Sequence, residues 1–237
     1  NLEAYRLWGD LFLEKYNAAD AERSYQEALE VNDRYVPALA GLARVNGDER
    51  ALEKALSVNP NSRAAKETYA QLLFINGREE DALNILNEVL VINPEALKSL
   101  SLLGAKAALE EREADFLKIR ERVALFSPKN PYFLGDVADT LGKQYRFEEA
   151  VVLLREALES DPQYWQGYAL LGTNLIRLGE EAEGRKNLEI GFENDPFNVM
   201  TSNLLEVYDT LDTYVTLESA HFRVNMVLST RSMSKEA

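Results

Sequence analysis

The 237-residue chain contains no cysteine and a single histidine, His221. Disulfides, thiol catalysis and thiolate metal sites are therefore excluded, and one histidine cannot form a two-histidine metal site. No glycine-rich phosphate loop occurs. Asp136 and Asp139 lie three residues apart and would share a helix face, but two carboxylates without further partners are usually only solvated. We therefore expect no enzyme activity, no metal and no cofactor.

Long apolar stretches and positive charge are also scarce. No run of 18 apolar residues is present, so no membrane span is expected. Lysine and arginine number 26 against 40 aspartates and glutamates, a net charge of −14. Phosphate contacts need clustered cations, so we expect no nucleic-acid partner. We interpret the negative charge first as a solvated outer surface, and alternatively as a preference for basic or neutral partner segments.

The N-terminus gives no information on compartment. No secretory apolar region opens the chain, and the first residue is Asn1 instead of Met. We expect a processed or trimmed end, at which any targeting signal would already be gone, so the localisation stays open.

Proline is rare, but its positions are regular. Five of the seven prolines recur every 34 residues, and each follows a small polar residue: Pro60, Pro94, Pro128, Pro162 and Pro196. Because proline lacks an N–H and restricts its predecessor, each pair ends a helix. A helix stop at a fixed interval indicates one structural unit copied along the chain.

Within each unit, apolar or small residues recur at helical spacings in two halves, which predicts one buried stripe per helix. Seventeen residues after the first four of these prolines stand Gly77, Glu111, Tyr145 and Gly179. Glycine there favours a tight turn with positive φ. Each unit is therefore predicted to be a helix, a short turn and a second helix.

This unit resembles the tetratricopeptide repeat family, over residues 2 to about 196. The first repeat carries Trp8-Gly9, Phe12, Ala21, Tyr25 and Ala28, with Asp33 where proline is expected. The second repeat is shorter, because only 27 residues separate Asp33 from Pro60. We expect two shortened helices there, over 36–46 and 48–58.

The predicted fold class is therefore all-α, a right-handed superhelical solenoid of about six helix-turn-helix repeats. The predicted divisions are the repeat array at 1–198, with repeat two shortened to 36–62, a capping helix at 199–212 and a β-like tail at 213–237. The tail is predicted from apolar residues that alternate after Tyr214, around a turn at 218–221. Two strands cannot form a stable sheet alone. We expect the tail to dock on the last helices or to pair with a second molecule as a weak homo-oligomer.

The family resemblance implies binding through a concave face lined by the first helix of each repeat. The Lys, Asn and Arg set with which chaperone adaptors clamp a C-terminal carboxylate is missing, so no such clamp is expected. A mixed floor with two aromatics and an acidic spot suits an extended peptide or a helix. The candidate peptide-binding residues are Gln71, Phe74, Lys98, Ser101, Tyr132, Asp136, Asp139, Gln166 and Thr173. For each, the alternative is packing against a neighbouring helix.

A second resemblance concerns residues 194–224. The segments Asn194-Asp195-Pro196-Phe197-Asn198, Tyr214–Glu218 and His221–Val224 resemble a junction in bacterial proteins, where tetratricopeptide repeats precede a zinc metallopeptidase-like domain. The His-Glu-x-x-His of that domain is absent from this chain. The expected function is a non-catalytic protein- or peptide-binding scaffold. The alternative is a substrate- or partner-binding module of a larger bacterial metallopeptidase-like protein, and a third option is a structural oligomer scaffold.

Overall fold

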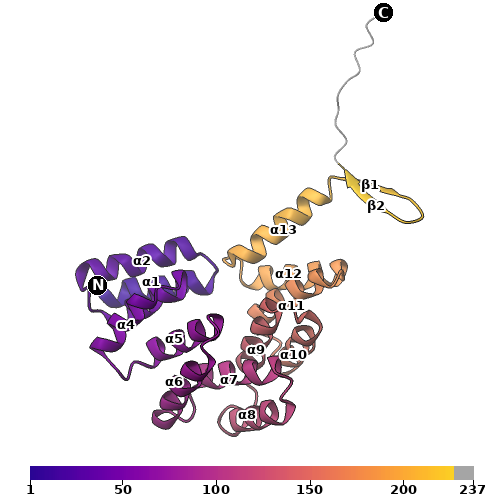
Figure 1. Cartoon of the computed structure of the whole chain (residues 1–237). Coiled ribbons are helices and arrows are strands. Elements are labelled where there is room, and N and C mark those ends of the chain that lie inside the picture. The colour runs from indigo at the N-terminus through magenta and orange to yellow at the C-terminus, as the bar shows by residue number, and fades with distance from the viewer. Residues whose placement is uncertain (227–237) are drawn as a thin grey trace, which may run out of the picture.

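A computed structural model describes residues 1–226, and this part of the chain holds thirteen helices and one two-stranded hairpin (Figure 1). The first six helices are α1 (Leu2–Glu14), α2 (Ala18–Val31), α3 (Val36–Asn46), α4 (Glu49–Val58), α5 (Arg63–Ile75) and α6 (Glu79–Ile92). They are followed by α7 (Leu97–Leu109), α8 (Glu113–Phe126), α9 (Pro131–Lys143), α10 (Phe147–Ser160), α11 (Trp165–Arg177), α12 (Glu181–Asn194) and α13 (Val199–Leu211). The chain ends in β1 (Val215–Glu218) and β2 (Arg223–Met226).

The first twelve helices form six helix pairs. We call the first helix of each pair the A helix (α1, α3, α5, α7, α9, α11) and the second the B helix. Consecutive A helices contact one another along the chain. The prediction of an all-α repeat solenoid is therefore confirmed. Every A helix has 13 residues and every B helix 14, except in repeat two, where α3 has 11 and α4 has 10.

The small polar residue before each periodic proline has a structural role. The side-chain oxygens of Asn59, Asn93 and Asp161 each accept the backbone N–H of the residue two positions on, at 3.0, 3.1 and 2.9 Å. Asn32 makes the same bond before Asp33, which takes the place of proline in repeat one. Such a bond forms a local turn that competes with helix continuation. Together with the proline that follows Asn59, Asn93 and Asp161, it ends α4, α6 and α10 at the same point of the repeat.

One residue with positive φ joins the two helices of each repeat. Repeats two, three and six use Gly47, Gly77 and Gly179, whereas repeats one, four and five use Tyr16, Glu111 and Tyr145, at φ of 58°, 57° and 63°. In five of these turns the next residue donates its N–H to the carbonyl five positions earlier, for example Asn17 to Phe12 at 2.8 Å. This closes the helix end as a Schellman motif.

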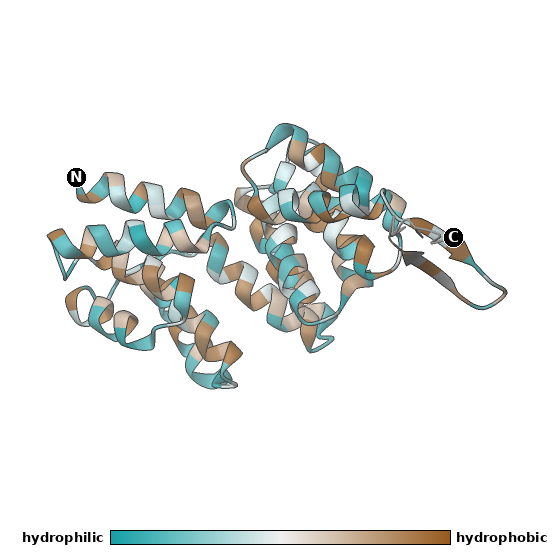
Figure 2. Ribbon diagram, turned by 90° about the horizontal axis from the view of Figure 1, so that it is seen from above, coloured by the Kyte–Doolittle hydropathy of each residue, from teal (hydrophilic) through white to brown (hydrophobic). Residues whose placement is uncertain are grey.

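Hydrophobic and hydrophilic residues alternate along the helices (Figure 2), and the buried hydrophobic residues form the core where the helices pack together. Small residues at the helix crossings let neighbouring backbones approach. Tyr25 is fully buried between Gly9 and Gly41. Its ring fits there because the neighbouring residue is glycine: a Cβ at Gly9 would lie 2.5 Å from the ring. Its hydroxyl donates to Asp10 at 2.6 Å, which satisfies the polar end of the buried ring.

The last helix and the hairpin extend away from the array (Figure 1). Thr201 is the buried residue of α13, and Leu211 is exposed, so α13 covers repeat six only in part. β1 and β2 pair antiparallel with Val215 opposite Met226, and every residue of β1 is exposed. The expectation that the tail docks on the last helices is therefore wrong for β1, and pairing with a second molecule stays a prediction. The remainder of the tail, 227–237, lies outside the described residues. No helix within 1–226 is long and apolar enough to cross a membrane.

Candidate functional site

The inner surface of the array is formed by the A helices, and we call it the groove. Its open part is a hollow of about 370 Å³ between α3, α5 and α7, lined by Arg44, Ala64, Glu67, Thr68, Gln71 and Lys98. The repeat geometry places these side chains together, because the A helices follow one another along this surface. We call this hollow the open hollow.

Charges of both signs are paired around the open hollow. The Lys98 ammonium lies 3.3 Å from Asp136, and an Arg44 Nη1 lies 3.4 Å from Asp10. Burial raises the pKa of Glu67, and the hydrogen bond from the Ser99 hydroxyl, at 2.9 Å, opposes that rise. Gln71 is exposed among these groups. The open hollow thus offers an amide, cations and a carboxylate, which suits the donors and acceptors of a peptide backbone.

The other part of the groove contacts the chain's own first repeat. The Lys15 ammonium lies 2.7 Å from Asp195, and the Lys15 carbonyl accepts the N–H of Val199 at 3.0 Å. The start of α13 therefore meets the end of α1 (Figure 1). The solenoid closes on itself at this point, which brings the first and last repeats together.

Tyr16 is the residue that enters the groove. It lines a hollow of about 290 Å³ together with residues of α9 and α11, among them Asp139, Leu170 and Thr173. Burial raises the pKa of Tyr16, the Asp139 carboxylate adds to that rise, and a hydrogen bond with Gln166 opposes it. The A helices of repeats five and six are therefore partly covered by a side chain of repeat one.

A third hollow, of about 410 Å³, lies beside this contact and is lined in part by Lys15, Tyr132, Gln166 and Asp195. Tyr132 is 54% exposed, and its ring meets that of Tyr164 edge-on, with centroids 5.1 Å apart. The aromatic face of Tyr132 is therefore available beside the closure.

The predicted site residues fall into three groups. Gln71 and Lys98 line the open hollow, Tyr132 and Gln166 line the third hollow, and Asp139 and Thr173 lie with Tyr16. Asp136 pairs with Lys98, and Asp139 pairs with Lys143 at 2.6 Å. The predicted acidic spot in repeat five is therefore largely neutralised by lysines.

Two predicted residues are unsuited to contact a peptide. Ser101 is 1% exposed, and its hydroxyl has no partner among the described residues. Phe74 packs against the cluster of Leu73, Leu86 and Leu102. The packing alternative applies to both. The repeat register placed Phe74 of α5 and Ser101 of α7 in the groove, but both side chains lie against neighbouring helices.

The sequence reasoning missed Lys15 and Tyr16. A tyrosine at the turn position, where three repeats have glycine, was the available signal. Their contacts with repeats five and six depend on the closure of the whole array, which a repeat pattern does not reveal.

The comparisons with known proteins agree with this fold. Residues 49–96 match a tetratricopeptide repeat family model. The chain is similar in structure to a thermophilic tetratricopeptide repeat protein of Thermus thermophilus, with 18% identity, a TM-score of 0.55 and coverage of 74% of this chain and 100% of that one. Pseudomonas aeruginosa pilF gives 19% identity, a TM-score of 0.50 and coverage of 87% and 97%. Human IFIT1, a dimer solved with m7Gppp-AAAA, gives 15% identity, a TM-score of 0.58 and coverage of 88% and 53%.

Among curated proteins, the Arabidopsis thaliana TPR repeat-containing thioredoxin TTL4 is 35% identical over 75 residues, which are 32% of this chain. The mouse protein O-mannosyl-transferase TMTC1 is 27% identical over 164 residues, 66% of this chain. The chain spans only 11% and 17% of the length of these relatives. Residues 49–96 thus match a tetratricopeptide repeat model, and the structural neighbours share the fold of this chain.

Proposed function

We propose that this chain is a non-catalytic scaffold that binds an extended peptide segment of a protein partner in the open hollow between α3, α5 and α7. The observation that supports this most is the difference between the two parts of the groove. The part near α9 and α11 holds the chain's own Tyr16, whereas the residues that line the open hollow of about 370 Å³ all belong to α3, α5 and α7. Tetratricopeptide arrays are typically protein-binding scaffolds, which agrees with this assignment.

The lining suits a peptide backbone better than a cofactor. Gln71 offers both an amide donor and an acceptor, and Lys98 and Glu67 supply opposite charges on either side of it. A side chain of the peptide reaches Tyr132 only where the segment continues from α7 toward α9. Because Tyr16 occupies the groove near α9 and α11, we expect the bound peptide to extend over the open hollow and no further than Tyr132.

A nucleic-acid partner is not part of this proposal. Human IFIT1, the neighbour solved with m7Gppp-AAAA, shares the fold with this chain at 15% identity. The net charge of −14 opposes the approach of phosphates, and the cations in the open hollow are already paired with carboxylates.

The test starts from peptides selected by phage display on the full chain, with their affinities then measured by calorimetry. Replacing Gln71 and Lys98 together by Ala should weaken a selected peptide by about 1–3 kcal/mol, as expected for contacts central to an interface. Glu53→Ala is the matched control, since Glu53 is exposed on α4, away from the groove. Equal loss from the control, or full binding by the double variant, would contradict a groove site.

The second candidate is the accessory module of a metallopeptidase-like protein. It rests on the resemblance of residues 194–224, which covers the end of α12, α13 and the hairpin. Reading the gene past Ala237 tests it: a downstream His-Glu-x-x-His would favour this candidate, and an immediate stop would remove it.

A further inference from the structure

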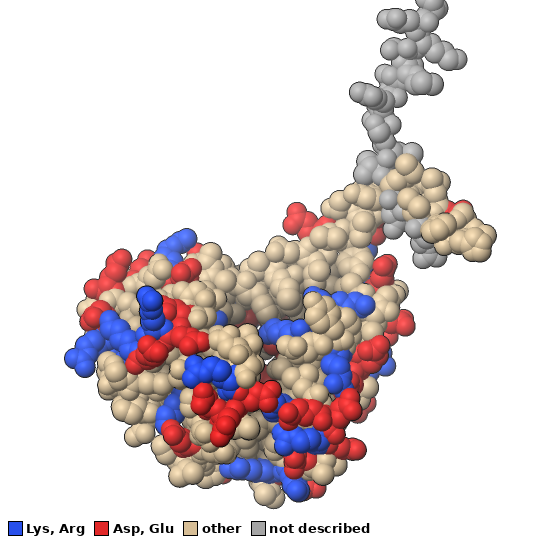
Figure 3. Space-filling model, in the orientation of Figure 1, with Lys and Arg blue, Asp and Glu red and all other residues tan. Residues whose placement is uncertain are grey.

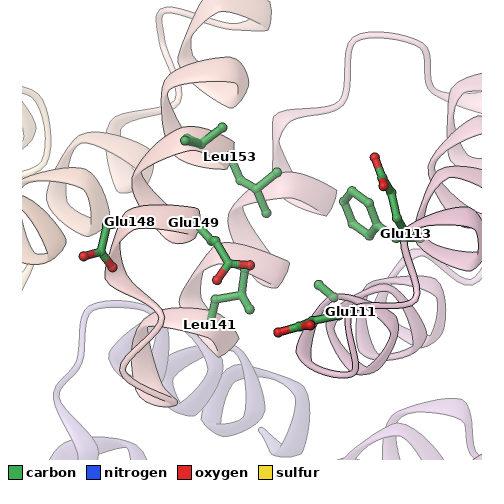
Figure 4. A pocket seen from close by; sticks show the side chains of 9 residues that line it. Glu111, Glu113, Leu141, Glu148, Glu149 and Leu153 are labelled. Carbon is green, nitrogen blue, oxygen red and sulfur yellow. The ribbon is translucent and has the colours of Figure 1, made fainter.

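A hollow of about 450 Å³ lies outside the groove, between the first halves of α8 and α10 (Figure 4). Its floor is apolar and consists of Ala108, Phe116, Leu141, Val152 and Leu153. Val152 is 65% exposed. A valine exposed beside a hollow of this size is apolar surface that no other described segment covers. Exposed apolar surface with a polar border often marks a binding site.

The border of this hollow is acidic. Glu111, Glu113, Glu148 and Glu149 line it, and Figure 4 shows Glu111 and Glu149 on opposite sides. Arg146 lies 3.7 Å from Glu111 and also pairs with Glu149. Within residues 1–226, Glu113 and Glu148 form no ion pair. Four carboxylates against one guanidinium leave three net negative charges around an apolar floor.

Helix stability explains only part of this border. Glu113 lies in the first turn of α8, and Glu148 and Glu149 lie in that of α10, where carboxylates favour the positive end of the helix dipole. Glu111 has no such role. It occupies the turn with a φ of 57°, where three repeats have glycine and where a side chain is strained. The turn thus carries an 81% exposed carboxylate beside the hollow in place of the less strained glycine.

We propose that this hollow is a second docking site, separate from the groove, for a basic peptide segment that carries one large apolar side chain. The apolar side chain would fill the hollow over Phe116 and Val152. Lysine or arginine on either side of it would pair with Glu113 and Glu148. A volume of about 450 Å³ is at the lower end of the range for ligand pockets, which suits one anchoring side chain.

Charge complementarity selects this occupant over a second copy of the chain. The chain carries a net charge of −14, so two copies repel each other, and an acidic border repels a further acidic surface. Figure 3 shows acidic side chains on this face of the molecule with Lys and Arg between them, so the attraction of a basic segment rests on the excess of negative charge.

The test uses the full chain and a fluorescein-labelled probe peptide, Gly-Arg-Arg-Trp-Arg-Arg-Gly, with affinity measured by fluorescence anisotropy. Replacing the probe's Trp by Ala should weaken binding by about tenfold or more, because the aromatic anchor is lost. Glu113→Gln with Glu148→Gln should weaken it by about threefold to tenfold at low salt, and this difference should shrink as salt rises. Val152→Gln should also weaken it, without a change in the salt dependence.

The matched control is Glu53→Gln with Glu80→Gln. Both residues are exposed, on α4 and α6, and the double variant changes the net charge by the same two units. It should leave the affinity within about twofold. Equal loss from this control would show nonspecific charge attraction, and a probe indifferent to its Trp would show that the hollow is not used. Loss only with Gln71→Ala would place the probe in the groove. Self-association abolished by Val152→Gln would identify a second copy as the occupant. Each of these outcomes would overturn the proposal.

Discussion

Lys15 and Asp195 are 180 residues apart in the sequence, yet the Lys15 ammonium lies 2.7 Å from the Asp195 carboxylate. The two residues end α1 and α12, so their ion pair joins the first repeat to the last. Both side chains are only about a fifth exposed, at 21% and 19%. A solenoid needs contacts only between neighbouring repeats. This ion pair therefore adds a contact that turns a linear array into a closed one.

The first prediction concerns the coupling between these two residues. A double-mutant cycle with Lys15→Met and Asp195→Asn, followed by urea unfolding, should give a coupling of about 1 kcal/mol, near the upper end for pairs that are not deeply buried. The control pair is Lys54 and Asp33, which lie at the same 2.7 Å but are 42% and 75% exposed. Its coupling should be close to zero. Equal coupling in both pairs would show that the Lys15–Asp195 pair stabilises the fold no more than an exposed ion pair does.

The second prediction concerns pH. Burial lowers the pKa of Lys15, but hydrogen bonds to Asp195 and Glu14 outweigh it and raise the pKa above its ordinary value of 10.5. A raised pKa in the folded state stabilises the fold below pH 10.5, and this contribution is lost as pH rises through the folded-state pKa. The thermal midpoint of the parent chain should therefore fall more steeply above pH 10.5 than that of Lys15→Met. Parallel curves would contradict the contribution of Lys15.

The third prediction compares two tyrosines at the same turn position. Tyr16 is packed against repeats five and six, whereas Tyr145 is 77% exposed, and both have positive φ. Glycine at either position removes the strain of a side chain with positive φ, about 1 kcal/mol. Tyr145→Gly should therefore stay within about 1 kcal/mol of the parent. Tyr16→Gly loses packing as well, and should be destabilised by about 1–2 kcal/mol.

Tyr16→Gly should also open the groove. We expect small-angle scattering to show a larger radius of gyration for Tyr16→Gly than for Tyr145→Gly. An unchanged radius together with unchanged stability would show that Tyr16 does not hold the closure.

The repeat architecture could be predicted from the sequence because it depends on short-range chemistry. Proline and the Asn or Asp before it end α4, α6 and α10 with the help of local bonds, such as that of Asn93 with Glu95. The shortened helices of repeat two follow from the same spacing, since fewer residues remain between two helix stops.

The candidate site was less predictable, because it depends on contacts between distant repeats. The family register places Phe74 and Ser101 in the groove, yet both pack against neighbouring helices. The sequence analysis gave no partner to Lys15, since Asp195 comes near it only after six repeats have curved round. Arg120 also pairs outside its own helix, since its guanidinium donates to Glu156 of the next repeat at 3.0 Å.

The fourth prediction concerns a helix crossing in repeat five. A Cβ added to Gly135 would meet the Tyr164 hydroxyl and lie 2.8 Å from the ring carbon that bears it. Tyr164 is 5% exposed, so its ring cannot move aside freely. Gly135→Ala should therefore destabilise the chain by about 1–3 kcal/mol, which urea unfolding would measure.

Tyr164→Phe provides the matched rescue for Gly135→Ala. It removes the clashing oxygen, so the double variant should recover part of the loss relative to Tyr164→Phe alone. Additive losses in the two single variants would show that the cost of Gly135→Ala has another origin.

The fifth prediction concerns the hairpin. β1 and β2 pair with each other, β1 is exposed throughout, and α13 buries only Thr201 against the array. Solenoid stability comes from contacts between neighbouring repeats, and the hairpin supplies none of these. Deleting 213–237 should therefore leave the thermal midpoint of unfolding, followed by circular dichroism at 222 nm, within about 2 °C of the parent, a shift equivalent to about 1 kcal/mol. The control is deletion of 199–237, which also removes the Val199 bond to Lys15 and should lower the midpoint further. If the shorter deletion alone unfolds the array, the hairpin is an integral cap. In that case we expect the exposed strands to be covered by a second molecule, since β1 is exposed within the chain itself.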